Sequence, residues 1–372
     1  MQNLLLSYWR CKLISSTTCS CRNAQLEKNV LLLFGEKKKL IRRSNYTHSS
    51  LNHAVYVRSA LSAGILPYEK GWAWQHVLLN RRLNYIRMQQ KLERSSGCDD
   101  EKDSEKRNIL YGDNDWILFF EHHPVYTLGR GAKEDYLTFL DNEPDGGAEK
   151  RKRLSRKYRG QDASILHIDH SQQSKTSNAI AAATTTDQEE VDEIFNHMCT
   201  AQPVFAPNGS PIYRIERGGE VTYHGPGQLV MYPLLNLKNP IYQKDLHCYL
   251  RKLEEVVIQT LLYFDITSNR DVINTGVWVG HNKIAAVGVS ATKWITTHGL
   301  ALNVNPKLEH FDKDIITPCG IEGRGVTSIS DILGGSSSSF DRCPSLKEVS
   351  AVALKCFEDV FEVDVTEGSP IR

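Results

Sequence analysis

The sequence predicts an α+β fold, in which a mixed β-sheet is flanked by helices. Residues 116–120 form a short continuous apolar run, as expected of a strand buried on both faces. Four β-rich runs follow one another late in the chain, at 276–279, 283–290, 294–297 and 300–304. Longer segments with apolar residues at helical spacing predict helices packed against the sheet.

Three segments predict helices. In residues 71–93 apolar side chains recur three and four positions apart. Asp245 is placed to cap a second helix, 246–262, whose apolar residues lie on one face. Ser345 and Glu348 form a capping box ahead of a third helical pattern.

Length and composition bound the class of protein. The chain has 372 residues, enough for one large core, and no stretch reaches the ~20 apolar residues of a membrane span. Its 45 Lys and Arg balance 44 Asp and Glu, which gives no support to a nucleic-acid-binding function. Nine cysteines, an odd number thinly spread, predict free thiols in a reducing compartment.

Both ends of the chain and one internal segment are expected to lie outside the folded domain, which we place at 61–335. Residues 1–60 have the composition of an organellar transit peptide, because residues 1–68 contain ten Lys or Arg and only two acidic residues. The alternative is a tail without a targeting role. Residues 336–372 are expected to form a C-terminal helix and tail.

The internal segment, at about 141–205, combines a basic cluster, an Ala/Thr stretch and an acidic cluster with weak apolar periodicity. This pattern predicts a surface insertion that is largely disordered. A basic patch that binds nucleic acid is the alternative interpretation.

A glycine-rich segment, residues 217–228, lies between predicted strands at 212–216 and 229–233. Its four glycines allow a ligand to approach the backbone closely. It lacks both the GxGxxG spacing of dinucleotide sites and the Gly-Lys-Ser/Thr of phosphate loops, so nucleotide binding is not indicated. Within it, His224 is either a hydrogen-bonded structural histidine or a proton donor and acceptor near neutral pH.

Cys319 and Lys283 form a candidate catalytic pair. The thiolate is the reactive form of cysteine, and a nearby ammonium favours it. Lys283 begins an apolar run, so we expect its amine to be partly desolvated and able to exchange protons. The two residues are 36 positions apart, so only the fold can bring them together. The alternative is a buried structural thiol and a surface lysine.

Five segments resemble, in the same order, the signature blocks of the lipoyl(octanoyl) transferases. They are residues 121–130, 217–228, 283–289, 297–304 and 318–320. The resemblance covers roughly residues 65–140 and 205–335, and the two ends and the insertion depart from it. It implies a fold like the catalytic module of biotin and lipoate ligases.

The resemblance also implies a reaction, the first step of endogenous protein lipoylation. An octanoyl or lipoyl group would pass from acyl carrier protein to a lysine of a lipoyl domain. Cys319 would carry the group as a thioester, and Lys283 would tune the thiol and move the proton. The acceptors would be lipoyl domains of 2-oxoacid dehydrogenase E2 subunits and the glycine cleavage H protein. No cofactor, metal or nucleic acid is implied.

The resemblance further implies a set of substrate-binding residues in three stretches of the chain. They are Arg217, Gly218, Gly219, Glu220, Val221, Thr222, Tyr223, His224, Ala286, Val287, Gly288, His298, Gly299, Leu300 and Ala301. The mitochondrion is the expected compartment, because lipoylated dehydrogenases work there, and a plastid is the alternative.

Three other functions stay open on the sequence alone. An ATP-dependent lipoate or biotin ligase on the same fold would not need Cys319. A module that only binds acyl carrier protein or lipoyl domains would need neither Cys319 nor Lys283. A cysteine hydrolase would use His224 or His298 as the base and water as the acceptor.

Overall fold

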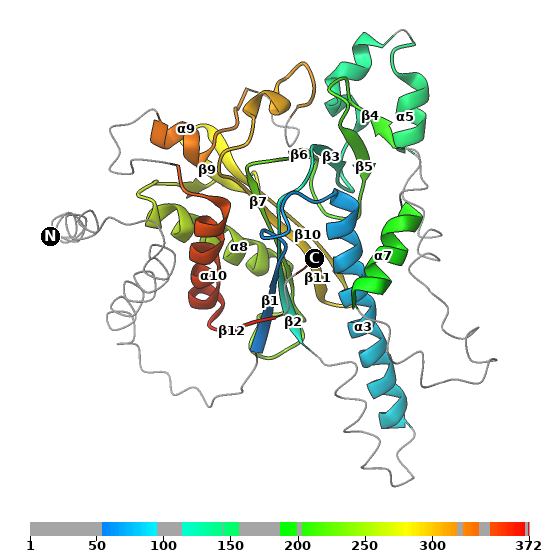
Figure 1. Ribbon diagram of the computed structural model, residues 1–372, viewed down its shortest axis with the longest axis vertical. Coiled ribbons are helices and arrows are strands. Elements are labelled where there is room, and N and C mark those ends of the chain that lie inside the picture. Colours follow the sequence, from blue (N-terminus) through cyan, green and yellow to red (C-terminus); the bar gives the residue numbers. More distant parts are fainter. Residues whose placement is uncertain are drawn as a thin grey trace, which may run out of the picture. The chain divides into compact units, whose positions relative to one another are not determined.

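Two β-sheets form the framework of the part of the chain that the structure describes (Figure 1). The structure is a computed structural model, and it describes residues 54–94, 114–143, 145–155, 187–198, 203–317, 323–334, 343–368 and 371. The larger sheet has, in spatial order, β12 (Asp364–Glu367), β1 (Ala54–Ser59), β2 (Asp115–Phe120), β7 (Gln228–Leu234), β11 (Ile295–Asn303), β10 (Asn282–Thr292), β9 (Val277–Val279) and β8 (Asn269–Arg270). The smaller sheet has β4 (Val204–Phe205), β5 (Pro211–Arg214), β3 (Val125–Leu128) and β6 (Val221–His224).

Helices cover both faces of the larger sheet (Figure 1). Helix α3 (Tyr68–Arg94) lies on one face, while α8 (Leu246–Tyr263) and α10 (Leu346–Phe361) lie together on the other. Helix α7 (Asp187–Met198) packs along α3. The remaining helical elements are short: α5 (Ala148–Ser155), α9 (Ile329–Gly334) and the 3-10 turns Glu134–Tyr136, Thr138–Asn142 and Leu308–Phe311. The predicted α+β class is confirmed.

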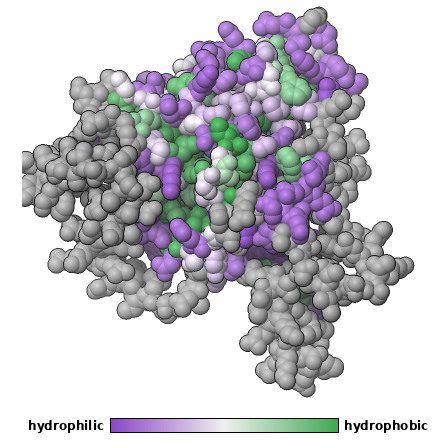
Figure 2. Space-filling model, viewed as in Figure 1, coloured by the Kyte–Doolittle hydropathy of each residue, from purple (hydrophilic) through white to green (hydrophobic). Residues whose placement is uncertain are grey.

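The core lies between the larger sheet and these helices. Leu118 and Phe120 of β2 pack under Trp72 of α3, together with Val230 and Tyr232 of the neighbouring strand β7. All seven residues of β7 are buried, as expected of a strand in the middle of a sheet covered on both faces. Figure 2 shows apolar residues gathered in the middle of one face of the molecule, with hydrophilic residues above and beside them.

Two of the three predicted helix starts are confirmed, whereas α3 begins at Tyr68, three residues before its predicted start at 71. The carboxylate of Asp245 accepts hydrogen bonds from the backbone N–H groups of His247 and Cys248, at 2.7 and 3.1 Å. Ser345 and Glu348 form the capping box at the start of α10. Each cap satisfies N–H groups that a helix leaves without a partner in its first turn.

One strand boundary differs from expectation. The runs 294–297 and 300–304 were predicted as two strands, but they form the single strand β11. His298 in its middle has a left-handed backbone (φ 60°), and the pairing with β10 nevertheless continues, with Gly299 opposite Gly288. Periodicity cannot foresee this continuity, because the neighbouring strands impose it.

The ends of the folded domain also differ from expectation. Strand β1 lies within the range predicted as transit peptide. It nevertheless belongs to the folded domain, because it pairs in parallel with both β2 and β12 and buries Val55 completely. Helix α10 and β12 belong to the same sheet and helix layer, so the C-terminal segment is part of the domain. Residues 1–53 lie outside the described residues.

The predicted insertion is partly folded. Helix α7 buries Val191 and Ile194 against α3, and Glu190 forms an ion pair with Arg81 of α3 at 2.8 Å. Residues 156–186 lie outside the described part of the chain. Among the helices that are described, none is both long and apolar enough to cross a membrane.

Candidate active site

A cavity of about 350 Å³ lies where strand β6 and the loop before it meet strands β10 and β11. This volume is within the range of small-ligand sites, ~300–1,000 Å³. Of the residues singled out from sequence, the cavity is lined by Arg217, Gly218, Gly219, Glu220, Val221, Thr222, His224, Lys283, Ala286, Val287, Gly288, His298, Gly299, Leu300 and Ala301. Three separate stretches of chain are therefore brought together at one place.

Lys283 lies in the wall of this cavity, and only 7% of its surface is exposed. Its Nζ donates a hydrogen bond to the carbonyl of Thr275 at 3.1 Å and lies 4.9 Å from the centre of the Trp278 ring. Its backbone N–H donates to the carbonyl of Gly325 at 2.9 Å, and its own carbonyl accepts from the N–H of Thr327 at 3.0 Å. The amine is thus held by the loop before β9, and the backbone is tied to the segment that follows residue 322.

The glycine-rich loop approaches β10 backbone to backbone. The N–H of Gly218 donates to the carbonyl of Val289 at 2.9 Å. A methyl group added to Gly288 would lie 3.0 Å from the carbonyl oxygen of Gly218, so any larger residue would push the loop away. Arg217 anchors the same loop, because its guanidinium donates to the carbonyl and the hydroxyl of Thr127 at 2.8 and 2.9 Å.

His224 is a buried neutral imidazole. Its Nδ1–H donates to Oε1 of Gln228 at 2.7 Å, and Gln228 in turn donates to Asn303 at 2.8 Å. Burial, and then the neighbouring His122, lower the pKa of His224 to about 3. Burial likewise lowers the pKa of His122 to about 4. Both rings are therefore uncharged at neutral pH and serve as oriented hydrogen-bonding groups.

A carboxylate that the sequence analysis missed holds His298. Oε1 of Glu216 lies 2.9 Å from Nε2 of His298 and 3.0 Å from Nε2 of His76, while Oε2 accepts from the indole N–H of Trp72 at 3.2 Å. Burial raises the pKa of Glu216, but the charge and hydrogen bonds of His298 and His76 outweigh this and hold it well below its ordinary value. Because an ionised carboxylate only accepts, both rings carry a proton on Nε2. The backbone N–H of His298 is bonded to Oε1 of Gln75 at 2.6 Å.

Comparison with known proteins identifies the family. Residues 193–358 match the family described as the lipoyl protein ligase A/B catalytic domain. A chloroplastic octanoyltransferase of Arabidopsis thaliana is 33% identical over 312 residues, which cover 83% of this chain and 79% of the relative. An octanoyltransferase of Nostoc punctiforme is 32% identical, and the alignment covers 82% of this chain and 90% of the relative.

The chain belongs to the octanoyltransferase family. It is therefore an acyltransferase enzyme. A solved lipoate-protein ligase A with bound ATP superposes with a TM-score of 0.44 at 13% identity, covering 86% of this chain and 89% of that one. Because this score is low, the assignment rests on the sequence relatives.

Among the described site residues of this octanoyltransferase, Tyr223 does not line the cavity. Tyr223 turns to the other side of β6, where its ring packs against Tyr126, His310 and Phe311, with ring centres 4.6–5.3 Å apart. Successive side chains of a strand point to opposite faces, so Thr222 and His224 line the cavity while Tyr223 does not. Cys319 lies outside the described residues.

A face of helix α3 carries the site residues that sequence reasoning missed. Trp72, Gln75 and His76 lie three and four positions apart and contact Glu216 or His298. Polar side chains at those spacings inside an otherwise buried helix could have signalled a site. Within the described ranges, no group of three or more His, Cys, Asp or Glu is arranged to hold a metal ion.

Proposed function

We propose that this octanoyltransferase moves an octanoyl or lipoyl group from acyl carrier protein to a lysine of a lipoyl domain, through a thioester on Cys319. In the first half-reaction the Cys319 thiolate attacks the thioester carbonyl of the donor, and the carrier sulfur leaves as a thiol after taking a proton from the Lys283 ammonium, which becomes a neutral amine. In the second, the acceptor amine attacks the Cys319 thioester, an amide forms, and the Cys319 thiolate is released with loss of a proton from the nitrogen. Because a thioester is already activated, neither step needs ATP.

The observation that carries this proposal is the position of Lys283 in a cavity bordered by the three predicted substrate-binding stretches. An ammonium at this point would favour the thiolate of a nearby cysteine. After the first step the same amine could accept the proton that the incoming lysine must lose, since that lysine arrives mostly protonated. The cavity provides room for an acyl chain, whose burial would contribute ~0.8 kcal/mol for each methylene.

The chain path is compatible with a meeting of Cys319 and Lys283. Cys319 precedes Gly325 by six residues, and the carbonyl of Gly325 is bonded to the backbone of Lys283. Six residues of chain span at most about 20 Å. A second, small cavity of about 20 Å³ adjoins Lys283 and is also lined by Arg324, Gly325 and Val326.

The test is a mass measurement on the intact protein. The wild type is incubated with octanoyl-acyl carrier protein in the absence of ATP, and we expect an octanoyl adduct on Cys319 that disappears when a lipoyl domain is added. Cys319→Ala should lose both half-reactions, with Cys248→Ala as the matched control at a thiol away from the cavity. Strict dependence on ATP would indicate ligation instead, and release of free octanoate despite the lipoyl domain would indicate hydrolysis.

The protein partners follow from the same proposal. Acyl carrier protein would be the donor, and lipoyl domains of 2-oxoacid dehydrogenase E2 subunits and the glycine cleavage H protein would be the acceptors. Transfer to each acceptor can be measured by the mass of its lysine-bearing peptide. An acceptor in which that lysine is replaced by arginine should remain unmodified.

We further propose that the N-terminal segment ahead of β1, within the predicted range 1–60, directs the enzyme to an organelle. The basic, hydroxyl-rich composition supports targeting in general. Of the two compartments, the plastid has support from the Arabidopsis thaliana relative, which is named as chloroplastic. A fluorescent protein fused after residue 60 should enter the organelle, and the same fusion lacking residues 1–50 should stay in the cytosol.

A further inference from the structure

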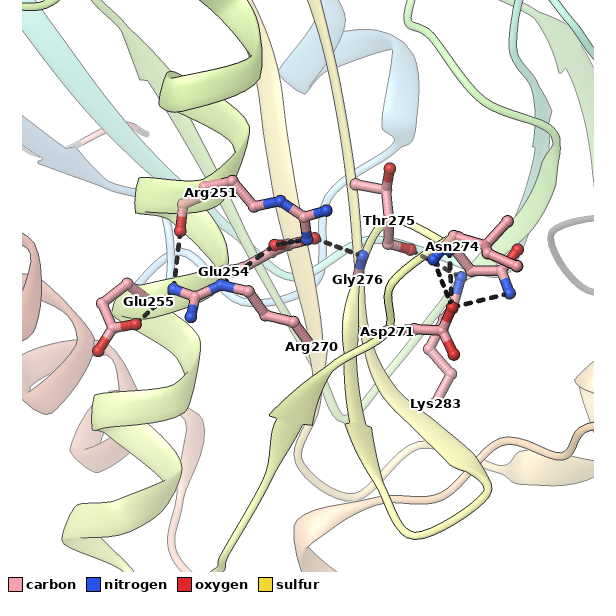
Figure 3. Close-up of polar contacts among 10 residues, drawn as sticks. Arg251, Glu254, Glu255, Arg270, Asp271, Asn274, Thr275, Gly276 and Lys283 are labelled. Atoms are coloured by element: carbon pink, nitrogen blue, oxygen red, sulfur yellow. Dashed lines mark hydrogen bonds and ion pairs between the residues drawn. The ribbon is translucent and has the colours of Figure 1, made fainter.

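One peptide group in the loop before β9 is hydrogen-bonded on both sides (Figure 3). Its carbonyl, which belongs to Thr275, accepts a hydrogen bond from Nζ of Lys283 at 3.1 Å. Its N–H, which belongs to Gly276, donates to Oε1 of Glu254 at 2.9 Å. The peptide group therefore connects a carboxylate on helix α8 to the amine in the cavity.

Glu254 is a fully buried side chain on the face of α8 that packs against the sheet. Its Oε2 accepts from Nη1 of Arg251 at 2.8 Å and lies 3.4 Å from Nε of Arg270. A buried carboxylate is costly unless charged partners and hydrogen bonds surround it. These two guanidinium groups surround Oε2 of Glu254, and the N–H of Gly276 is bonded to Oε1.

The geometry of the peptide group depends on Gly276. Its backbone has φ 126°, which side-chain-bearing residues rarely adopt. A methyl group at this position would lie 2.7 Å from the carbonyl oxygen of Ala285 and 3.2 Å from Cε of Lys283. Only glycine allows the peptide group to lie this close to the lysine side chain.

The two hydrogen bonds strengthen each other. A bond from the N–H to an anion polarises the peptide group, which makes its carbonyl a better acceptor, by ~10–30% per bond. The carbonyl of Thr275 is therefore a good partner for a protonated amine and a poor one for a neutral amine. The negative charge of Glu254 is transmitted to Lys283 in this way.

Two charged groups near Lys283, Arg324 and Asp271, are paired with each other. Arg324 lies over the same Trp278 ring, 4.6 Å from its centre, and would disfavour a second positive charge. However, Nη1 of Arg324 is 2.5 Å from Oδ2 of Asp271. Asp271 also accepts the backbone N–H groups of Ile273 and Asn274, which holds the loop in place. Arg217, Glu220 and His298 also line the cavity, and each is bonded to other residues.

We propose that Glu254 is a positioning residue, which acts through the Thr275–Gly276 peptide group to hold the Lys283 amine in the cavity in its protonated form. The proposal deepens the function proposed above and rests on the role given there to Lys283. It adds a residue from another layer of the fold, on the far side of the loop from the cavity.

The test compares Glu254→Gln with Glu255→Gln. Glutamine at 254 can still accept from Gly276, but it removes the charge. Glu255 is the next residue of α8; it binds Arg270 and makes no contact with the Thr275–Gly276 peptide group. Glu255→Gln therefore removes the same charge and serves as the matched control. The full-length proteins, without substrate, are treated with acetic anhydride over a range of pH, and acetylation of Lys283 is quantified by peptide mass spectrometry.

In Glu254→Gln the protonated amine loses its support, so the neutral, reactive amine should appear at lower pH. A displacement of the pH profile by about half a unit corresponds to roughly threefold faster acetylation on its rising part. Glu255→Gln should follow the wild-type profile. If folded Glu254→Gln also follows it, the proposal is wrong.

A second variant covers the case in which Glu254→Gln does not fold. Gly276→Ala leaves the carboxylate and its ion pairs in place but displaces the peptide group, so it should shift the profile in the same direction. An unchanged profile in a folded Gly276→Ala protein would contradict the proposal.

Measuring the transfer reaction distinguishes a failure of the positioning role of Glu254 from a failure of the proposed function. In an active wild type, Glu254→Gln should lower kcat for acylation about tenfold and leave KM for the donor within twofold, as expected when an interaction on the catalytic group is lost. A shifted acetylation profile in a protein without any transfer activity would uphold the positioning role and overturn the proposed function.

Discussion

The side chain and the backbone of Lys283 have different partners. The side chain meets a carbonyl oxygen and an aromatic ring, both of which favour a positive charge, while the backbone pairs with residues 325 and 327. The side-chain amine of Lys283 therefore has the proposed chemical role, while its backbone atoms hold the strand in place. Removal of the amine need not disturb the strand, because the backbone bonds remain.

Lys283→Ala should slow acylation of Cys319 by about a hundredfold or more, the usual contribution of a positioned acid or base. The thermal unfolding temperature should stay near that of the wild type. The matched control is Lys293→Ala, at an exposed lysine in the turn between β10 and β11, which should acylate at the normal rate. Near-normal acylation by Lys283→Ala would show that the proposed Cys–Lys pair is wrong.

Glu216 is the residue whose charge couples α3 to strand β11. Glu216→Gln should lower the free energy of unfolding at pH 7 by about 3 kcal/mol, because hydrogen bonds to a charged group contribute ~1.5–3 kcal/mol each and the substitution removes that charge. The pKa of Glu216 is lower in the folded chain than its ordinary 4.5. Its stabilising effect is therefore present above that value and is lost as the pH falls through the folded pKa.

Urea unfolding of the wild type and of Glu216→Gln at pH 7 and pH 4 checks this expectation. The difference between the two proteins should be smaller at pH 4. The exposed Glu309→Gln variant, with its side chain 66% exposed, should match the wild type at both pH values. A difference that grows on acidification would refute the assignment of an ionised carboxylate.

At the scale of elements, helix α3 has two functions. Its apolar residues cover one face of the sheet, and Trp72, Gln75 and His76 hold Glu216 and His298 at the wall of the cavity. Helix α7 in turn packs on α3. The segment between the ranges 65–140 and 205–335, which the family resemblance covers, thus supports a helix that contacts the site.

Ile194→Ala tests this support from α7. Ile194 is 3% exposed and packs in the core cluster of α3, so its truncation should cost about 2–4 kcal/mol of stability. Glu193→Ala, on the exposed side of the same helix, should change stability by less than about 0.5 kcal/mol. Equal, small effects of both variants in urea unfolding would mean that α7 is not anchored to the domain.

At the scale of the whole molecule, two buried neutral histidines make stability depend on pH. The pKa values of His122 and His224 are lowered by burial to about 4 and about 3, from 6.5. Between pH 6.5 and pH 4 the unfolded chain binds protons that the folded chain does not, so stability falls on acidification. Each histidine contributes a slope of about 1.4 kcal/mol per pH unit in the fully developed range.

His224→Gln should reduce this slope by the contribution of one histidine, since glutamine can still donate to Gln228 and takes up no proton. The measurement is the free energy of unfolding from urea titrations between pH 6 and pH 4.5. Exposed His247→Gln serves as the control and should keep the wild-type slope. An unchanged slope in His224→Gln would show that His224 is charged in the folded protein.

The fold was predictable from sequence where local pattern decides. The helices with caps at Asp245 and Ser345 were correct, because their signals lie within one turn of the helix start. Strands β1 and β12 were not foreseen, because short strands depend on neighbours distant in the chain for their hydrogen bonds. For the same reason the two expected runs around His298 turned out to be one strand, β11.

The sequence by itself determined the α+β class, the glycine-rich and lysine-bearing stretches, and membership of the octanoyltransferase family, because these depend on residues close together in the chain. Only the tertiary structure decided that Glu216 meets His298 and that Glu254 meets Gly276, which are 82 and 22 residues apart. In sequence, Glu254 is one of two adjacent acidic residues of α8, and the local pattern does not distinguish it from Glu255. Burial against the sheet and a bond to one peptide group distinguish it, and both arise only when distant segments pack together.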